Sequence, residues 1–91
     1  MGQPTPIILK VTAPEYGNLV TECSDGKRYH SDLSSLSQVH CYPKTLKEWS
    51  KVSIDSYGLG LIWENRFEVH ADQVIGLSSK SEDLPQTKKV G

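Results

Sequence analysis

The chain has 91 residues, of which 36% are hydrophobic and 23% are charged, and its 10 Lys and Arg residues are balanced by 11 Asp and Glu residues. That length supports one hydrophobic core and leaves no room for a second. The net charge of −1 lacks the basic excess that phosphate contacts require of most nucleic-acid-binding proteins, and no apolar stretch approaches the roughly 20 residues that cross a bilayer.

The first part of the chain predicts three strands. Apolar and polar residues alternate over residues 7–13, as in a half-buried strand, and Pro14 ends this strand because proline lacks the N–H that a ladder needs. Residues 18–23 and 27–32 have the composition of two further strands. Between them, Asp25-Gly26 predicts a tight hairpin with a type I′ turn, which needs positive φ at both central positions.

Two short helical turns are predicted next. Asp32 can cap a turn over residues 33–36 by accepting backbone N–H bonds. The segment from Thr45 to Glu48 fits a capping box. In the helix that this box starts, we expect Leu46 and Trp49 to share the inner face, because they stand three residues apart.

The last part of the ordered sequence predicts a hairpin and a closing helical turn. Residues 52–55 alternate like the start of a fourth strand. The next two strand segments meet at Glu64-Asn65, where the asparagine can adopt the left-handed conformation. A helical turn over residues 71–77 would then cover the sheet. The side chains expected on the inner face of this hairpin are Leu59, Leu61, Trp63, Phe67 and Val69.

Together these elements predict an α+β fold, with a small antiparallel sheet of about five strands and one or two short helices packed on one face. Residues 1–5 are expected to be a flexible N-terminus, and residues 6–78 the single α+β domain. Residues 79–91 are polar and show no apolar period, so they are predicted to be a disordered tail.

No constellation for metal binding or catalysis is evident in the sequence. The cysteines and histidines show neither C-x-x-C nor H-x₃-H spacing. His30-Ser31-Asp32 contains the residue types of a nucleophilic triad, but adjacent strand residues point to opposite faces. We therefore expect a protein without enzymatic activity, cofactor or bound metal, and any role of His40-Cys41 stays open.

Two sets of residues are candidates for binding a partner. We expect the binding surface to lie in the loops at 14–18 and 37–44 or at the sheet edges. Tyrosine is enriched at protein interfaces, and four tyrosines fall at predicted turns or strand edges. They are Tyr16, Tyr29, Tyr42 and Tyr57. Under the alternative of a nucleic-acid-binding accessory domain, the phosphate-contacting residues would be Lys27, Arg28, Lys44, Lys47 and Lys51.

A series of short motifs carries a resemblance to a known family. In chain order they are Val11, Leu19-Val20, Asp25-Gly26, Asp32-Leu33, Leu46-Lys47-Glu48-Trp49, Val52-Ser53-Ile54-Asp55, Ile62-Trp63 and the run from Phe67 to Val74. In order and spacing, residues 7–77 resemble the small bacterial family known as domain of unknown function 2442. The chain departs from that pattern at Glu64-Asn65-Arg66, where the family often has Pro or Gly, and in the segment 37–44.

The resemblance implies a small α+β fold with an antiparallel sheet, no established activity and no catalytic residues. Members of the family are sometimes joined to helix-turn-helix domains, or encoded beside another small protein in arrangements that look like toxin–antitoxin pairs. By this resemblance we expect a non-enzymatic interaction module, antitoxin-like or regulatory, that binds a protein partner or itself. The N-terminus shows no charged leader pattern, so the expected location is the cytoplasm, with no membrane association.

Overall fold

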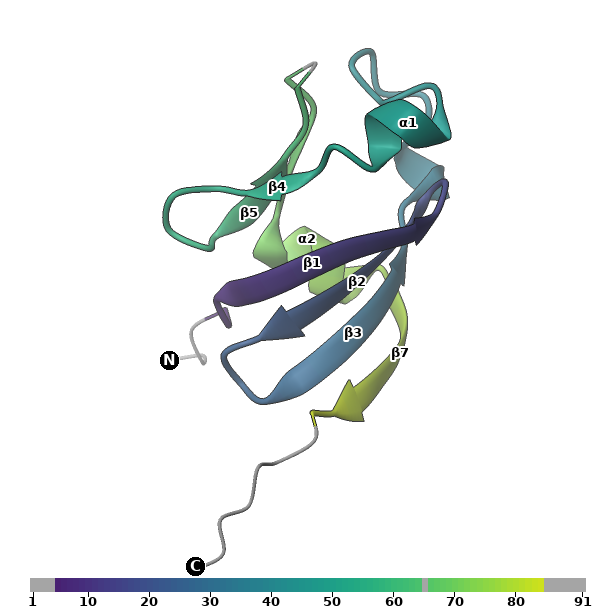
Figure 1. Ribbon diagram of the computed structural model, residues 1–91. Coiled ribbons are helices and arrows are strands. Elements are labelled where there is room, and N and C mark those ends of the chain that lie inside the picture. The colour runs from purple at the N-terminus through teal and green to yellow at the C-terminus, as the bar shows by residue number, and fades with distance from the viewer. Residues whose placement is uncertain (1–4, 65, 85–91) are drawn as a thin grey trace, which may run out of the picture.

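The computed structural model describes residues 5–64 and 66–84, which form an α+β fold with two antiparallel sheets (Figure 1). The larger sheet has the strand order β1-β2-β3-β7 and the smaller one the order β4-β5-β6. The α+β prediction is confirmed, whereas the single sheet of about five strands is wrong. The elements are β1 (Ile8–Glu15), β2 (Asn18–Cys23), β3 (Lys27–Asp32), the 3₁₀ turn η1 (Ser34–Leu36), α1 (Leu46–Trp49), β4 (Ser53–Ile54), β5 (Gly60–Ile62), β6 (Glu68–His70), α2 (Ala71–Gly76) and β7 (Ser78–Asp83).

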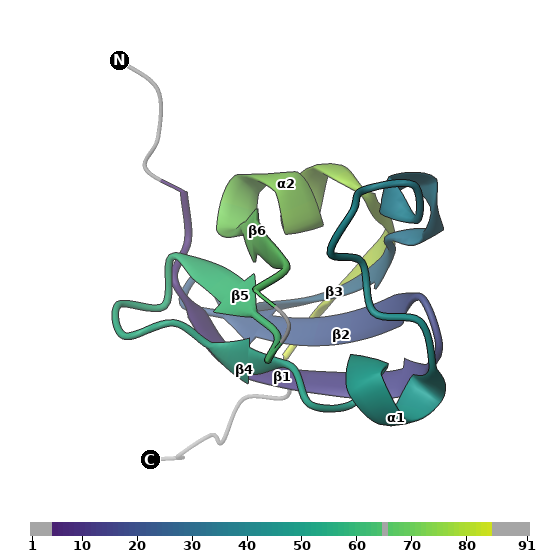
Figure 2. The ribbon, with the colours of Figure 1, turned by 90° about the horizontal axis from the view of Figure 1, so that it is seen from above.

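The smaller sheet and α2 cover one face of the larger sheet, and α1 lies near the end of β1 where the chain turns into β2 (Figure 2). Helix α2 carries the chain from β6, in the smaller sheet, back to β7, in the larger one. The core fills the space between these layers, since its side chains come from both sheets and both α-helices. They include Ile8, Leu19, Cys23, Trp49, Leu61, Trp63, Val69, Ala71 and Val74.

The hairpin of β2 and β3 has the predicted bounds and a different turn. Of its two central residues only Gly26 has positive φ, at 79°, so the connection is not type I′. The Gly26 N–H donates to the Cys23 carbonyl, and the Lys27 N–H donates to the Asp25 carboxylate. This pattern fits a three-residue loop in which a type I turn is followed by a left-handed glycine, a common hairpin connection.

The C-terminal segment departs most from the prediction. Ser78–Asp83 form β7, which pairs antiparallel with β3 from Lys27↔Asp83 to Ser31↔Ser78. The prediction of a disordered tail from residue 79 is therefore wrong for residues 79–83, and the domain extends past residue 78. Residues 85–91 of that predicted tail, and residues 1–4 of the predicted flexible N-terminus, lie outside the described part of the chain.

The inner face of the smaller sheet largely follows the prediction. Leu61, Trp63, Phe67 and Val69 are buried as expected. Leu59 is half-exposed, because it belongs to the loop before β5 whose backbone the Asp55 carboxylate holds by accepting the Leu59 N–H. Leu46, expected on the inner face of its helix, is exposed, because it lies in the first turn of a one-turn helix. Arg66 has a positive φ of 73°, and the expectation for Asn65 lies outside the described residues.

The predicted cap at Thr45 is present, whereas Asp32 lies one residue before the N-cap of η1, which is Leu33. Asp32 accepts the Ser34 N–H at 2.9 Å, and the Thr45 hydroxyl accepts the Glu48 N–H at 3.1 Å. The Glu48 carboxylate reaches back to the Lys44 N–H at 2.8 Å rather than to that of Thr45. These bonds satisfy N–H groups that short helices leave without intrahelical acceptors.

Candidate functional site

An aromatic cluster, which includes Tyr42 of the loop at 37–44, lies between the two sheets. The rings of Tyr42, Trp49, Trp63 and Phe67 contact one another with centroids 5.0 to 5.3 Å apart. The Trp49 indole N–H donates to the Asn18 carbonyl at 2.9 Å, and that of Trp63 donates to the Trp49 carbonyl at 2.8 Å. Both indoles are thus anchored by a hydrogen bond as well as by packing.

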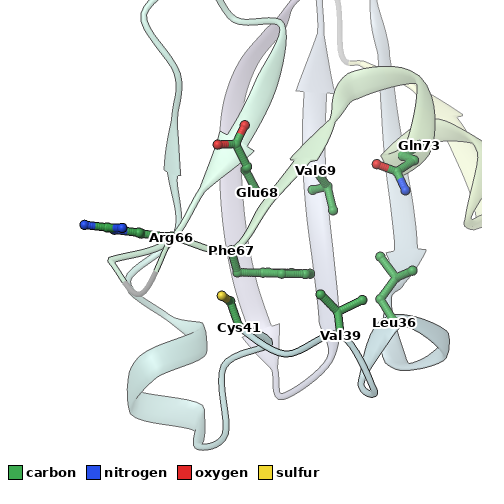
Figure 3. A pocket seen from close by; sticks show the side chains of 8 residues that line it. All are labelled: Leu36, Val39, Cys41, Arg66, Phe67, Glu68, Val69 and Gln73. Atoms are coloured by element: carbon green, nitrogen blue, oxygen red, sulfur yellow. The ribbon is translucent and has the colours of Figure 1, made fainter.

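An open apolar cleft with a volume of about 230 Å³ lies beside this cluster, and Phe67 belongs to both (Figure 3). Its apolar side chains come from β6 and the residue before it, and from η1 and the loop that follows η1. Leu36 and Val39 converge from one side on Phe67 and Val69 from the other (Figure 3). The full lining is Leu36, Val39, Cys41, Arg66, Phe67, Glu68, Val69 and Gln73.

Local structure explains why these side chains meet. The period of two along the strand buries Phe67 and Val69 and turns Glu68 outward. Across the cleft, two successive turns hold the loop: the Val39 N–H donates to the Leu36 carbonyl at 2.9 Å, and the Tyr42 N–H donates to the Val39 carbonyl at 3.0 Å. Val39 is thereby held in the lining of the cleft, together with Phe67, with 46% of its surface exposed.

The rim of the cleft carries both signs of charge. The Arg66 and Glu68 side chains point away from the apolar floor (Figure 3). Among the residues that the structure describes, neither of them forms an ion pair. An apolar centre surrounded by a charged, solvated rim is the arrangement typical of protein–protein interfaces.

The four predicted tyrosines do not form one surface. Tyr42 is only 2% exposed, so it belongs to the core and not to a contact surface, and burial raises its pKa to about 12. Tyr16 packs on Tyr42 and donates its hydroxyl to the Pro43 carbonyl at 2.6 Å. Tyr29 lies in β3, where a hydrogen bond to the Asp25 carboxylate raises its pKa to about 12. Tyr57, in the loop between β4 and β5, is 77% exposed.

The predicted basic set is divided between the two ends of the larger sheet. Lys27 and Arg28 begin β3 beside the β2–β3 hairpin, whereas Lys44, Lys47 and Lys51 lie in and around α1, at the opposite end (Figure 1). Arg28 contacts the carboxylates of Glu22 and Glu82, at 3.3 and 3.5 Å, and Lys51 lies 3.7 Å from that of Glu64. The two groups therefore offer no continuous phosphate-binding face.

The His30-Ser31-Asp32 segment is not a catalytic triad. The His30 ring contacts the Glu82 carboxylate at 2.7 Å on the outer face of the sheet, while the buried Ser31 hydroxyl donates to the Val74 carbonyl of α2. The Asp32 carboxylate accepts the Ser34 N–H at the start of η1, and this bond lowers the pKa of its carboxyl. In residues 5–64 and 66–84, no cluster of His, Cys, Asp and Glu has the arrangement of a metal site.

Sequence reasoning pointed to the loop at 37–44 but missed the cleft itself. The only local signal is Val39, an apolar residue inside the polar stretch from Ser37 to His40. Its partner across the cleft, Phe67, is far away in sequence, so the pair is visible only after folding.

A comparison of the chain with protein-family models, with curated proteins and with solved structures found no match. The resemblance to domain of unknown function 2442 therefore stays a prediction. In the part of the chain that is described, no helix has the length and apolar character needed to cross a membrane.

Proposed function

We propose that this chain is a non-enzymatic interaction module that binds a protein partner by accepting an apolar side chain into the cleft. The observation that carries this proposal is Val39, which is held half-exposed over the buried Phe67 and Val69. Exposed apolar surface that faces an apolar concavity is hydrated at a cost in free energy, and a partner's side chain removes it from water.

The size of the cleft supports a side chain as the occupant. Its volume of about 230 Å³ is below the range of about 300–1,000 Å³ that sites for small molecules usually have. Covering the exposed half of Val39 contributes on the order of 1 kcal/mol to the binding free energy, so a stable complex needs contacts at the rim as well. Arg66 and Glu68 can make these contacts, because they can pair with opposite charges on either side of the inserted group.

An antitoxin-like or regulatory role would suit such a module and rests on the family resemblance alone. The alternative, a nucleic-acid-binding accessory domain, would depend on Lys44, Lys47 and Lys51 near α1. A titration with duplex DNA at two salt concentrations separates the two, because binding through phosphate contacts is strongest at low salt. Tight DNA binding at low salt that is lost at higher salt would favour the alternative.

The decisive experiment compares two exposed apolar residues. Val39→Asp places a charge in the cleft, whereas Leu46→Asp places one on α1, where the wild-type side chain is 52% exposed, compared with 46% for Val39. We expect a partner protein captured from the native host by the wild-type chain to be captured equally by Leu46→Asp and lost with Val39→Asp. Circular dichroism of both variants checks that they are folded.

A partner that binds all three proteins equally would show that the cleft is not the binding site. A partner lost equally with both substitutions would indicate a nonspecific effect of added negative charge, and would contradict the proposal in the same way.

A further inference from the structure

Strand β7 forms an open edge of the larger sheet. Its one neighbour among the described strands is β3, and the order β1-β2-β3-β7 ends with it. Its residues, from Ser78 to Asp83, are polar and mostly exposed. Such an edge presents a row of N–H and C=O groups that another strand can pair with.

The phase of the β3–β7 ladder shows which groups face outward. The Leu84 N–H donates to the Gly26 carbonyl at 2.8 Å, one step beyond the pair Lys27↔Asp83. Hydrogen-bonded and non-hydrogen-bonded pairs alternate in an antiparallel ladder. The pairs Arg28↔Glu82 and His30↔Lys80 therefore exchange bonds within the sheet, and Ser81 and Asp83 direct their N–H and C=O groups to the free edge.

This phase limits how β7 could pair with a second copy of itself. An antiparallel partner must place an outward-facing residue opposite another one. The β3–β7 pairing shifts register between His30 and Ser31, so the regular alternation holds for Ser81 and Asp83, while Ser79 lies at the irregularity. Counting Ser79 as well, Ser81 can stand opposite Ser79, Ser81 or Asp83 of the second copy. The first arrangement brings Lys80 opposite Lys80, and the third brings Glu82 opposite Glu82. With Ser81 opposite Ser81, Lys80 of each copy stands opposite Glu82 of the other.

Cross-strand pairs of opposite charge stabilise a sheet, and like charges directly opposite each other destabilise it. Lys80 and Glu82 lie on the outer face of the sheet, where Lys80 already lies 3.8 Å from the Glu82 carboxylate of its own chain. In the paired arrangement each lysine gains a second carboxylate without leaving this face. One of the three registers is thus complementary in charge and the other two are repulsive.

We infer that the chain self-associates through β7, pairing antiparallel with β7 of a second copy around a twofold axis at Ser81, so that the two larger sheets become one. This surface is separate from the cleft and does not depend on its role. An interface made of one polar strand from each copy is small, so the association is weak and depends on concentration.

Sedimentation velocity of the full chain over a concentration series tests the inference. We expect the wild-type chain to shift from monomer to dimer as its concentration rises. Ser81→Pro removes an outward-facing N–H and leaves the ladder to β3 intact, and Lys80→Glu places carboxylates opposite one another. Both variants should remain monomeric over the same series, while Ser81→Thr, which keeps the N–H, and Val39→Asp should still dimerise.

Cross-linking tests the register. In a Cys41→Ser background, we expect a mixture of the Lys80→Cys and Glu82→Cys chains to form a disulfide-linked dimer faster than either chain alone. A wild-type chain that stays monomeric throughout would overturn the inference. So would a dimer that Lys80→Glu leaves unchanged, or faster cross-linking of Lys80→Cys with itself.

Discussion

The rings of Tyr16 and Tyr42 lie edge to face, with their centroids 6.1 Å apart, but only one of the two hydroxyl groups has a hydrogen-bond partner among the described residues. The Tyr16 hydroxyl donates to the Pro43 carbonyl at 2.6 Å. The Tyr42 hydroxyl is buried and has no hydrogen-bond partner among the described residues. A polar group that loses water without gaining a partner lowers stability by about 1–3 kcal/mol.

We therefore predict opposite effects of the same substitution at the two sites. Tyr42→Phe should leave the free energy of unfolding unchanged or raise it by about 1 kcal/mol, because it removes an unsatisfied hydroxyl and keeps the ring in the aromatic cluster. Tyr16→Phe should lower it by about 1 kcal/mol, because the Pro43 carbonyl loses its donor. Urea unfolding of both variants measures the difference, and a larger loss for Tyr42→Phe than for Tyr16→Phe would contradict the prediction.

At the scale of elements, β2 and β3 show what local sequence can predict. Alternation and Asp25-Gly26 gave their bounds correctly, because both signals act within a few residues. The turn type was wrong, because Asp-Gly fits more than one hairpin connection. Leu46 was misplaced for a related reason: in a helix of one turn, spacing alone does not decide which side chains face the core.

Strand β7 and the cleft mark the limit of such reasoning. β7 is an edge strand with both faces largely exposed, so its sequence, Ser-Ser-Lys-Ser-Glu-Asp, has no apolar period to reveal it. What orders it is the backbone ladder to β3 and the contacts of Glu82, which come from distant positions in the chain. The cleft depends likewise on Val39 meeting Phe67 after folding.

Glu82 makes the attachment of β7 sensitive to pH. The hydrogen bond with His30 is the main cause that lowers the pKa of the Glu82 carboxyl, and the positive charges of His30, Lys80 and Arg28 add to it. The folded state thus favours the ionised carboxylate more than the unfolded state does. This stabilisation is fully present above the unfolded-state pKa of about 4.3, and it is lost as the pH falls through the lower folded-state pKa.

We predict that Glu82→Gln removes this part of the acid dependence. The wild-type chain should be more stable than the variant at neutral pH, and the difference in the free energy of unfolding should shrink as the pH falls below about 5. Urea unfolding at a series of pH values measures both curves. Curves that stay parallel down to pH 3 would show that the Glu82 contacts do not contribute to the pH dependence of the free energy of unfolding.

At the scale of the whole molecule, contacts at several places connect the two sheets, among them the hydrogen bond that the Ile8 N–H of β1 donates to the Gly58 carbonyl in the loop between β4 and β5. The aromatic cluster joins them at one end, where Trp63 donates to the Trp49 carbonyl and Trp49 donates to Asn18 of β2. Helix α2 joins them in the middle, because Ser31 of β3 donates to its Val74 carbonyl and the chain then continues into β7. We expect the described part of the chain to unfold as one unit, since neither sheet has a core of its own.

The last prediction follows from this dependence. A chain that ends at Leu77 lacks β7, so β3 becomes an edge strand and loses its ladder partners together with the contacts of Arg28 and His30 to Glu82. Each backbone hydrogen bond contributes about 0.5–1.5 kcal/mol net, so the loss amounts to a few kcal/mol out of the about 5–15 kcal/mol typical of a small domain. We expect the melting temperature to fall by about 10 °C or more.

A chain that ends at Leu84 is the matched control, because it keeps every contact that the structure describes. Thermal melts followed by tryptophan fluorescence and by far-UV circular dichroism should shift together in the shorter chain. If the two truncated chains melted at the same temperature, β7 would not be part of the folded unit, and the prediction of a disordered tail from residue 79 would stand.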